Sequence, residues 1–325
     1  MKALLLKEKN QWQNMKVEEA RGPSIQEDEI LVEVHAAGLN PVDYKTATNG
    51  NPNWKYPHIL GLDVAGTVAD PGNSSFKKGD RVVYHGDLTK KGGYAEFAAA
   101  KADAVSLIPD RVSFEEAAAL PTAGYTAYQA LHRKLPFDQI STILIHAGAG
   151  GVGGFAIQLA KLAGKTVFST ASKHNHEYVK LLGADYVLDY REQDVKAEIL
   201  MLTNGKGVDA VLDTVSRQNA TDSLDMLAFM GHIAYIAGAP DFTKIPGFTK
   251  VVSYHEVALA AAYTANDKDA VKDLSVIGSD MLRLCAEGKL NPMIAETITL
   301  DEVPEALIRL SDRHVKGKII AKIKN

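Results

Sequence analysis

The sequence contains very little cysteine: Cys285 is the only one in 325 residues. A disulfide bond within the chain is therefore excluded, and so is a zinc site built from several cysteines. A chain with one cysteine fits a reducing compartment, so we expect a cytoplasmic protein.

The chain also has no large excess of charge of one sign and no long apolar run. The chain has 36 Lys and Arg against 40 Asp and Glu, a net charge of −4. It therefore has no strong positive field that would attract nucleic acid or an anionic membrane. The apolar run within Met1–Lys7 is too short for a signal peptide or a membrane span. We expect neither a nucleic-acid partner nor a membrane partner.

The length and composition are those of a two-domain globular protein. Domains hold roughly 100–200 residues, and 46% of this chain is hydrophobic, which suffices for two cores. The first third is rich in short strand patterns, namely Ile30–Val34, Val64–Val68 and Arg81–Tyr84. Turn-forming residues separate them, so this part predicts a partly open β-barrel or a sandwich.

The pattern changes at Ser113. Ser113 and Glu116 have the spacing of a capping box, which predicts a helix through Leu120. Pro121 interrupts that helix, and a second helix is expected over Thr122–Arg133.

From Thr142 onward, apolar strands alternate with helices. Strands are expected at 142–146, 166–170, 186–189, 208–213 and 232–237, and helices at 152–162, 176–182, 195–202 and 220–229. This alternation predicts an α/β fold with a doubly wound parallel sheet of the Rossmann type. Glu256–Tyr263 is a possible sixth strand. Its apolar character would favour pairing with a second copy, so we expect a homodimer joined there.

The C-terminal region returns to helix and strand patterns. Lys272–Glu287 and Asp301–Ser311 predict helices. Lysines then alternate with isoleucines, which predicts a strand whose lysine face is solvated; these lysines are Lys316, Lys318, Lys322 and Lys324.

A glycine-rich loop carries the strongest functional signal. Gly148, Gly150 and Gly153 form G-x-G-x-x-G between a predicted strand and a predicted helix. In that position the glycines let the backbone approach a pyrophosphate, and the helix N-terminus offers free N–H groups. A tight turn without a ligand is the alternative, and the βα units that follow make it the weaker one.

The second strand indicates which dinucleotide binds. A site that prefers NAD has an acid about 20 residues beyond the glycines, whereas Phe168–Lys173 has none. Ser172 and Lys173 offer a hydroxyl and a cation, which suit a 2′-phosphate. We therefore expect NADPH, the alternative being an ordinary polar turn before a helix.

Five further motifs extend the pattern along the chain. They are AGLNPVD at 37–43, GLDVAG at 61–66, GDRV at 79–82, GGYAEF at 92–97 and LPTAGYTA at 120–127. With the glycine loop, these motifs resemble the medium-chain dehydrogenase/reductase superfamily, in particular its zinc-free quinone oxidoreductase-like and enoyl-reductase branches. Zinc-dependent members carry ligands where this chain has Asn40, Leu62 and about Thr122. These residues do not form a zinc site, and the cysteine-rich lobe for a second zinc is absent, so no metal is expected.

The resemblance implies the domains and the site. It implies a GroES-like, partly open β-barrel catalytic domain over 1–122 and 268–325, and a Rossmann NADPH-binding domain over 123–267. The implied catalytic residues are Asn40, Tyr44 and Thr126, and the implied cofactor-binding residues are Gly148, Gly150, Gly151, Val152, Gly153, Ser172, Lys173, Tyr190, Ala237 and Gly238. Several quinone reductases have a tyrosine two residues beyond the acidic position, where this chain has Lys45, and Tyr44 can equally be a packing residue.

A zinc-free site restricts the acceptor. Without a Lewis acid the acceptor has to be electrophilic by itself, as quinones and conjugated carbonyl compounds are. We expect an NADPH-dependent quinone oxidoreductase. The alternatives are an enone or enoyl double-bond reductase, a non-catalytic NADPH-binding protein, and a zinc-type alcohol dehydrogenase-like protein that has lost its metal.

Overall fold

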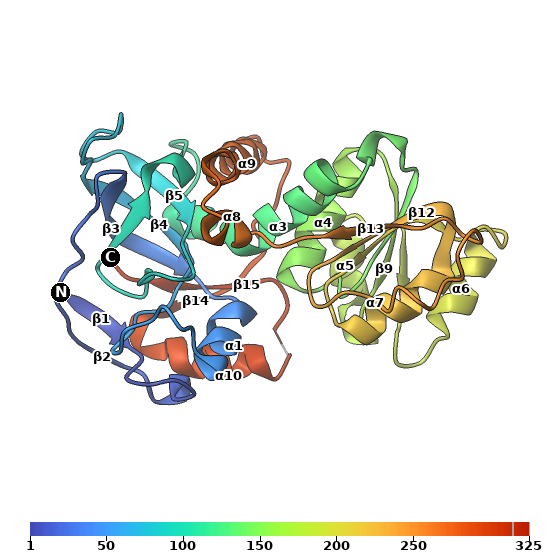
Figure 1. Ribbon diagram of the computed structural model, residues 1–325, viewed down its shortest axis with the longest axis horizontal. Helices are drawn as coiled ribbons and strands as arrows, with labels where there is room; N and C mark the ends of the chain where they lie inside the picture. Colours follow the sequence, from blue (N-terminus) through green and yellow to red (C-terminus); the bar gives the residue numbers. More distant parts are fainter. Residues whose placement is uncertain (314, 325) are drawn as a thin grey trace. The chain divides into compact units, whose positions relative to one another are not determined.

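A computed structural model describes residues 1–313 and 315–324. Positions 314 and 325, inside the expected 268–325 segment, lie outside the described residues. The chain forms two compact units (Figure 1). Unit 1 comprises Met1–Tyr125 and Ala260–Asn325, and unit 2 comprises Thr126–Leu259. In the part of the chain that is described, no helix combines the length and the apolar character needed to cross a membrane.

Unit 2 contains a six-stranded, fully parallel sheet with the order β10-β9-β8-β11-β12-β13. The strands are β8 (Thr142–Ile145), β9 (Thr166–Thr170), β10 (Tyr186–Leu188), β11 (Val208–Asp213), β12 (Leu227–Tyr235) and β13 (Ser253–Glu256). Counted from β8, this is the order 3-2-1-4-5-6, so the predicted Rossmann fold is confirmed. The strands are apolar because helices cover the sheet (Figure 1), and Leu144, Val211 and Ile233 are fully buried in its core.

Helices connect these strands. They are α4 (Gly151–Leu162), α5 (His176–Leu181), α6 (Val195–Leu202) and α7 (Arg217–Ser223), and α3 (Thr126–Gln129) precedes the sheet. The order of the strands reverses between β8 and β11. In an open α/β sheet a ligand binds at the carboxyl ends of the strands on either side of such a reversal.

Unit 1 contains a mixed, largely antiparallel sheet with the order β14-β15-β3-β4-β5-β7, and β6 pairs with β3. Its strands are β3 (Glu29–Gly38), β4 (Asp63–Asp70), β5 (Arg81–His85), β6 (Phe97–Lys101), β7 (Ser106–Leu107), β14 (Ile294–Thr299) and β15 (Lys318–Lys322). A separate two-stranded sheet, β1 (Lys2–Leu5) with β2 (Lys16–Glu19), precedes these strands in the sequence. The helices are α1 (Pro41–Asn49), α2 (Phe114–Ala118), α8 (Ala261–Thr264), α9 (Lys268–Ala286) and α10 (Val303–Ser311). The GroES-like β fold is therefore confirmed.

The capping box at the start of α2 is confirmed, and the helix expected after it is altered. The amide of Glu116 donates to Ser113 Oγ, and the amide of Ser113 donates to the Glu116 carboxylate. The expected helix over Thr122–Arg133 consists of the π-helical turn η3 (Pro121–Tyr125), α3 and the π-helical turn η4 (Ala130–Lys134). Proline has no N–H and crowds the preceding turn, so the helix widens there instead of ending.

Two expectations near the C-terminus are wrong. Glu256–Tyr263 is not a strand, because β13 ends at Glu256 and the alanines that follow form α8 in unit 1. Alanine favours a helix over a strand. The expectation that the lysines of the last strand face solvent is wrong for Lys318, which is only 3% exposed, whereas Lys322 on the same strand is exposed.

Candidate functional site

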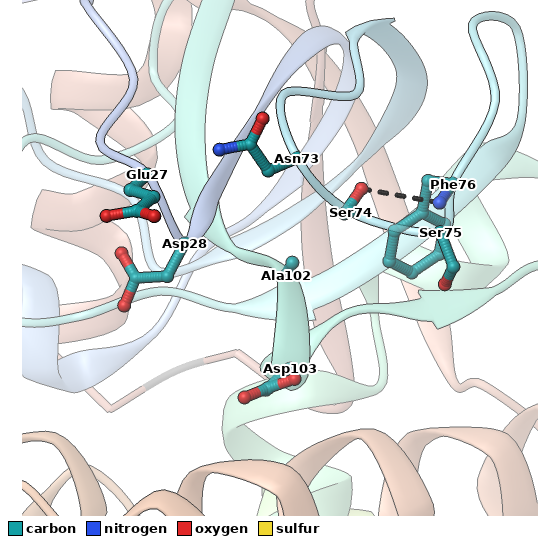
Figure 2. Close-up of a pocket in the computed structure, with 8 residues that line it drawn as sticks. All are labelled: Glu27, Asp28, Asn73, Ser74, Ser75, Phe76, Ala102 and Asp103. Carbon is teal, nitrogen blue, oxygen red and sulfur yellow. Dashed lines mark hydrogen bonds between the residues drawn. The ribbon is translucent and has the colours of Figure 1, made fainter.

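A surface hollow of about 230 Å³ in unit 1 contains none of the expected site residues (Figure 2). Its wall includes Glu27, Asp28 and Asp103, together with serine and asparagine side chains. Asp28 is ion-paired with Lys101, which lowers the pKa of this carboxyl. The hollow does not contribute to the site described below.

Asn40, a predicted catalytic residue, lies in a buried polar cluster of unit 1. It is the N-cap of α1, and its backbone N–H donates to Asp43 Oδ2 at 2.8 Å. Its side-chain Nδ2 donates to Asp63 Oδ2 at 2.8 Å. Its Oδ1 accepts a hydrogen bond from Lys318 Nζ at 2.5 Å. Asn40 itself is 2% exposed, so both ends of its amide are held by charged groups inside the protein.

Among residues 1–313 and 315–324, no cation lies within hydrogen-bonding distance of the Asp43 carboxylate. Its Oδ2 accepts from the backbone of Asn40 and from Tyr94 Oη, the latter at 2.9 Å. Burial raises the pKa of Asp43 to about 7, and the nearby Asp63 charge adds to the rise. Asp43 lines a pocket of about 10 Å³ beside Trp54, His58 and Leu62, which has room for about one water molecule.

Tyr44, the second predicted catalytic residue, has different neighbours. It is half-buried, and its ring packs against Trp12 with 5.6 Å between ring centroids. Burial raises the pKa of its phenol. The structure therefore does not bring Tyr44 into the cluster that holds the Asn40 amide, and its contacts are those of a packing residue.

The residues at the zinc-ligand positions do not fit a zinc ion. Leu62 is a buried hydrocarbon side chain, and the Asn40 amide is held by Lys318 and Asp63. Thr122 donates from its backbone N–H and from its hydroxyl to Asp63 Oδ1, at 2.8 and 2.5 Å. Zinc requires thiolate, imidazole or carboxylate ligands. Over the described residues, no group of three such side chains is arranged to hold a metal.

The glycine loop of unit 2 joins β8 to α4. A Cβ atom added to Gly153 would lie 2.4 Å from the carbonyl oxygen of Ala147, so only glycine fits there. A Cβ on Gly150 would have one neighbour, at 3.4 Å, which leaves the outer side of the loop open. Gly150 is the N-cap of α4, and the first-turn amides of Gly151, Val152 and Gly153 have no partner within the helix. The loop therefore fits the pyrophosphate of a dinucleotide.

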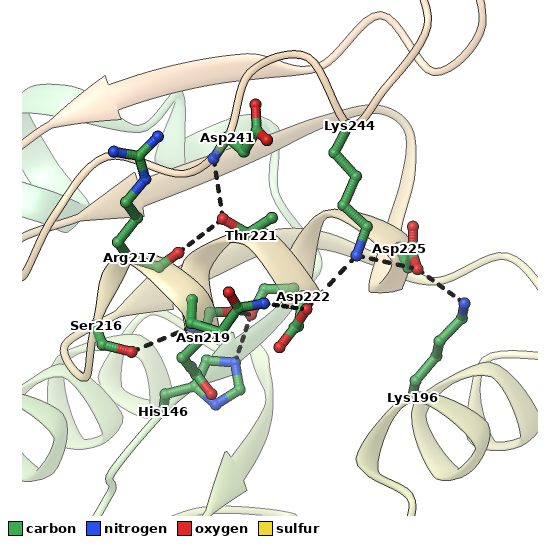
Figure 3. Close-up of polar contacts among 12 residues, drawn as sticks. His146, Lys196, Ser216, Arg217, Asn219, Thr221, Asp222, Asp225, Asp241 and Lys244 are labelled. Atoms are coloured by element: carbon green, nitrogen blue, oxygen red, sulfur yellow. Dashed lines mark hydrogen bonds and ion pairs between the residues drawn. The ribbon is translucent and has the colours of Figure 1, made fainter.

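The buried side chain of His146 connects the strand end at which this loop begins to the neighbouring elements. His146 follows β8; its Nδ1 lies 3.0 Å from Thr170 Oγ1, and its Nε2 lies 2.9 Å from Ser223 Oγ. Figure 3 shows His146 beneath α7. Burial lowers the pKa of His146 to about 4, so the imidazole is neutral near pH 7. The ends of β8 and β9 and helix α7 are thereby held together.

Ser172 and Lys173 lie in the turn after β9; Lys173 is exposed, whereas Ser172 is 8% exposed and its Oγ accepts a hydrogen bond from Asn175 Nδ2 at 3.3 Å. Leu188 of β10 pairs with Thr170 of β9, so Tyr190 and its neighbour Arg191 lie at the same edge of the sheet. Asp189 also lies there, but its carboxylate accepts hydrogen bonds from the backbone amides of Lys173, at 3.0 Å, and Arg191, at 2.9 Å. The bond from Arg191 lowers the pKa of Asp189 most. Arg191 is a cation that the sequence analysis missed.

The segment after β12 contains Ala237 and Gly238. Gly238 has φ +126°, and a Cβ there would lie 3.2 Å from Arg217 Cβ. Arg217 begins α7, whose N-cap Ser216 accepts from the amide of Asn219 (Figure 3). The segments after β8, β11 and β12 thus lie at the carboxyl ends of adjacent strands, and Arg217 is a second cation that sequence reasoning missed.

Thr126, the third predicted catalytic residue, belongs to unit 2. It is the first residue of α3 and is 8% exposed. The expected catalytic residues are therefore divided, with Asn40 and Tyr44 in unit 1 and Thr126 in unit 2.

Comparison with known proteins yields two family matches and relatives that cover the chain. Residues 26–110 match the alcohol dehydrogenase GroES-like domain, and residues 151–279 match the zinc-binding dehydrogenase family. A chloroplast envelope quinone oxidoreductase homolog of Arabidopsis thaliana is 34% identical over 312 residues, which cover 92% of this chain and 91% of the relative. The trans-enoyl reductase ACTTS2 of Alternaria alternata is 38% identical over 220 residues, 62% of each chain.

A solved structure agrees with the sequence relatives. The quinone oxidoreductase from Coxiella burnetii is 32% identical, with a TM-score of 0.82, over 100% of this chain and 99% of that chain.

Proposed function

The chain belongs to the medium-chain dehydrogenase/reductase superfamily, and on this premise we propose that it is an NADPH-dependent, zinc-independent quinone reductase. The oxidoreductase class and the use of a nicotinamide dinucleotide follow from the family. The choice of NADPH and of a quinone or another conjugated carbonyl as acceptor is our proposal.

One observation carries the proposal for NADPH. At the edge formed by the ends of β9 and β10, the exposed side chains of Lys173 and Arg191 offer donors beside the buried Ser172 hydroxyl, while Asp189 is occupied by two backbone amides. A 2′-phosphate needs donors and positive charge. A ribose 2′-hydroxyl would instead need a carboxylate that is free to accept. Tyr190, which is about half exposed, completes the proposed phosphate-binding set.

The remaining cofactor contacts follow the loops of unit 2. The amides of Gly151, Val152 and Gly153 would bind the pyrophosphate, and Gly148 and Gly150 let the backbone turn and approach it, the Gly150 amide donating to the Ala147 carbonyl oxygen within that turn. Backbone groups of Ala237 and Gly238 bind the carboxamide of the nicotinamide. When bound, the reduced nicotinamide supplies a hydride.

The catalytic contribution of the protein is positioning. In this proposal Thr126 and Asn40 lie near the nicotinamide, and Asn40 donates a hydrogen bond to the oxygen that becomes negative as the acceptor is reduced. Tyr44 stays a candidate donor, although its ring packs against Trp12, and bulk water is the alternative proton source. The residues at the zinc-ligand positions cannot hold a zinc ion, which would be the Lewis acid in a zinc-dependent relative. The acceptor therefore has to be activated by its own conjugation.

Reduction of an enone or enoyl double bond is the second candidate function. The name of the Alternaria relative, a trans-enoyl reductase, favours it. Hydride addition to a conjugated alkene also develops negative charge on a carbonyl oxygen, so the same Asn40 donor would serve both reactions.

The experiment is a screen of NADPH oxidation with quinones, enals and aldehydes, with zinc analysis of the same sample. Turnover of quinones without stoichiometric zinc supports the proposal. Turnover of enones with no quinone supports the second function. NADPH binding without oxidation by any acceptor indicates a non-catalytic binding protein, and stoichiometric zinc with alcohol oxidation indicates a zinc alcohol dehydrogenase.

We further propose a cytoplasmic homodimer. The single cysteine favours a reducing compartment. Strand β13 is the edge of the six-stranded sheet, and an edge strand offers unpaired backbone groups to a second copy. The strand that pairs would be Ser253–Glu256 and not the Glu256–Tyr263 segment expected from the sequence.

A further inference from the structure

Lys318 is a buried cation with three oxygen partners. Its Nζ donates to the carbonyl oxygen of Leu39 at 3.1 Å, to Asn40 Oδ1 at 2.5 Å and to Asp63 Oδ2 at 3.3 Å. An ammonium group has three hydrogens, so every donor of Lys318 is used. The side chains of Lys318 and Asp63 are 3% and 0% exposed, so the ion pair is shielded from water.

Stability alone does not call for this arrangement. Removing two charges from water costs several kcal/mol per ion, and well-packed apolar side chains usually fill such a place equally well or better. The ion pair therefore has to be explained by the neighbouring group whose position it determines. The group it contacts is the amide of Asn40, a residue expected in catalysis.

The two charges determine how the Asn40 amide is oriented. The oxygen and nitrogen of an amide are nearly equal in size, so sterics alone do not choose between its two flipped orientations. Lys318 can only donate, so Asn40 Oδ1 has to face it. The Asp63 carboxylate only accepts, so Asn40 Nδ2 has to face it. Thr122 holds the other carboxylate oxygen, which keeps Asp63 in place.

This orientation leaves one Asn40 hydrogen weakly bound. One N–H of Nδ2 points to Asp63 at 2.8 Å, and within the described part of the chain the other has only the carbonyl oxygen of Gly38, at 3.5 Å, the limit of a hydrogen bond. In the flipped amide an oxygen would replace this donor. The flipped amide could not stabilise a developing oxyanion.

We propose that Lys318 is a positioning residue of the reductase reaction: with Asp63, its ammonium group holds the Asn40 amide in the one orientation that keeps an N–H available to the acceptor. The inference rests on the proposed function, in which Asn40 is the donor. The titratable groups beside Lys318 are Asp63 and Asp43; Tyr94 is hydrogen-bonded to Asp43, and His85 and Tyr125 interact with Asp63.

The decisive variant is the charge-balanced double substitution Lys318→Met with Asp63→Asn. It removes both charges together, so no unpaired ion is left in the core. An amide at position 63 can donate or accept, and a thioether at position 318 can do neither to any useful extent, so both orientations of Asn40 become possible. The matched control is Lys322→Met, which removes an exposed lysine from the same strand.

We expect the double variant to keep its Tm and its NADPH Kd, because the dinucleotide loops belong to unit 2. Its kcat should fall by about tenfold or more while the KM for the acceptor stays unchanged, since one oriented donor contributes at least that much. Lys322→Met should leave all four quantities unchanged. A double variant with wild-type kcat would overturn the inference, as would a loss explained entirely by a lower Tm.

A second measurement does not need turnover. In ¹H–¹⁵N NMR spectra of the wild type, the Asn40 side-chain hydrogen that is bonded to Asp63 should exchange slowly, and this protection should be lost in the double variant. Asn40→Ser assigns the signals. Unchanged protection in the double variant would overturn the inference. If the wild type reduces no acceptor, the proposed function fails, and the exchange result still decides whether the Lys318–Asp63 pair holds Asn40.

Discussion

The backbone amide of Lys173 donates a hydrogen bond of 3.0 Å to the carboxylate of Asp189. This bond joins the turn after β9 to the turn after β10, and it places an acid at the edge where the sequence of β9 suggested only hydroxyls and a cation. The acid is already used, because its other oxygen accepts from the amide of Arg191 at 2.9 Å. Asp189 therefore holds the two turns together, and the side chains of Lys173 and Arg191 determine the charge at this edge of the sheet.

The first prediction concerns this charge. A hydrogen bond to a charged group contributes about 1.5–3 kcal/mol. Lys173 is exposed and ion-paired with Glu192, so we expect the lower end of that range, and Lys173→Ala should weaken NADPH binding by about tenfold. NADH binding should not change, because NADH has no 2′-phosphate. Fluorescence titration with both dinucleotides measures the two Kd values.

The control for that experiment is Lys180→Ala, which removes an exposed lysine from α5. It should leave both Kd values unchanged. Equal weakening of NADPH and NADH by Lys173→Ala would contradict the proposed phosphate contact and would indicate a distorted turn.

The second prediction concerns the glycine loop. Gly153→Ala should weaken binding of either dinucleotide by more than about tenfold and cost roughly 1–3 kcal/mol of unfolding free energy, because its Cβ would lie 2.4 Å from the Ala147 carbonyl oxygen. Gly247→Ala is the matched control in the same unit, with nothing within 4 Å of the added Cβ. Isothermal calorimetry and thermal denaturation measure the effects, and tight binding by Gly153→Ala would show that the loop does not hold the pyrophosphate.

The third prediction follows from Asp43, whose pKa burial raises to about 7 from an unfolded value of about 3.9. A carboxyl with a raised pKa stabilises the folded state fully below the unfolded pKa, and that stabilisation is lost as pH rises toward 7. The unfolding free energy should therefore fall between about pH 4 and pH 7, by up to about 1.4 kcal/mol per pH unit. Asp43→Asn should remove this slope, because an amide does not titrate.

Urea denaturation at several pH values tests the Asp43 prediction. Asp110→Asn, at an exposed position, serves as the control and should keep the wild-type slope. A slope that persists in Asp43→Asn would place the titration at another group.

The parts of the fold that sequence predicted correctly depend on local signals. The capping box of Ser113 and Glu116 involves residues three apart, and the glycine loop is a continuous segment between a strand and a helix. Alternating apolar strands and helices likewise indicate a parallel sheet without knowledge of distant contacts. These features were recovered because each lies within one short stretch of the chain.

The missed features depend on partners far apart in the sequence. Lys318 contacts Asn40 and Asp63, which are 278 and 255 residues away, so a period-two pattern could show its face of the strand but not what covers that face. Arg191 is placed beside Lys173 by the register of β9 and β10. Such signals appear only when the strand order is known, as the order 3-2-1-4-5-6 now allows.

The last prediction concerns the edge of unit 2. Apolar side chains are exposed near β13, since Phe229, Met230 and Val251 are each more than half exposed, and the amide of Met230 bonds to the carbonyl oxygen of Lys250. If a second copy pairs at this edge, Val251→Lys should convert dimer to monomer, because a lysine there would be buried without a partner. Light scattering at micromolar concentration measures the mass, with Leu181→Lys, an exposed apolar position on α5, as the control. Because Leu181 lies in the helix before β10, at the opposite edge of the sheet, dissociation by both variants would mean that β13 is not the contact, and a wild-type monomer would rule the dimer out.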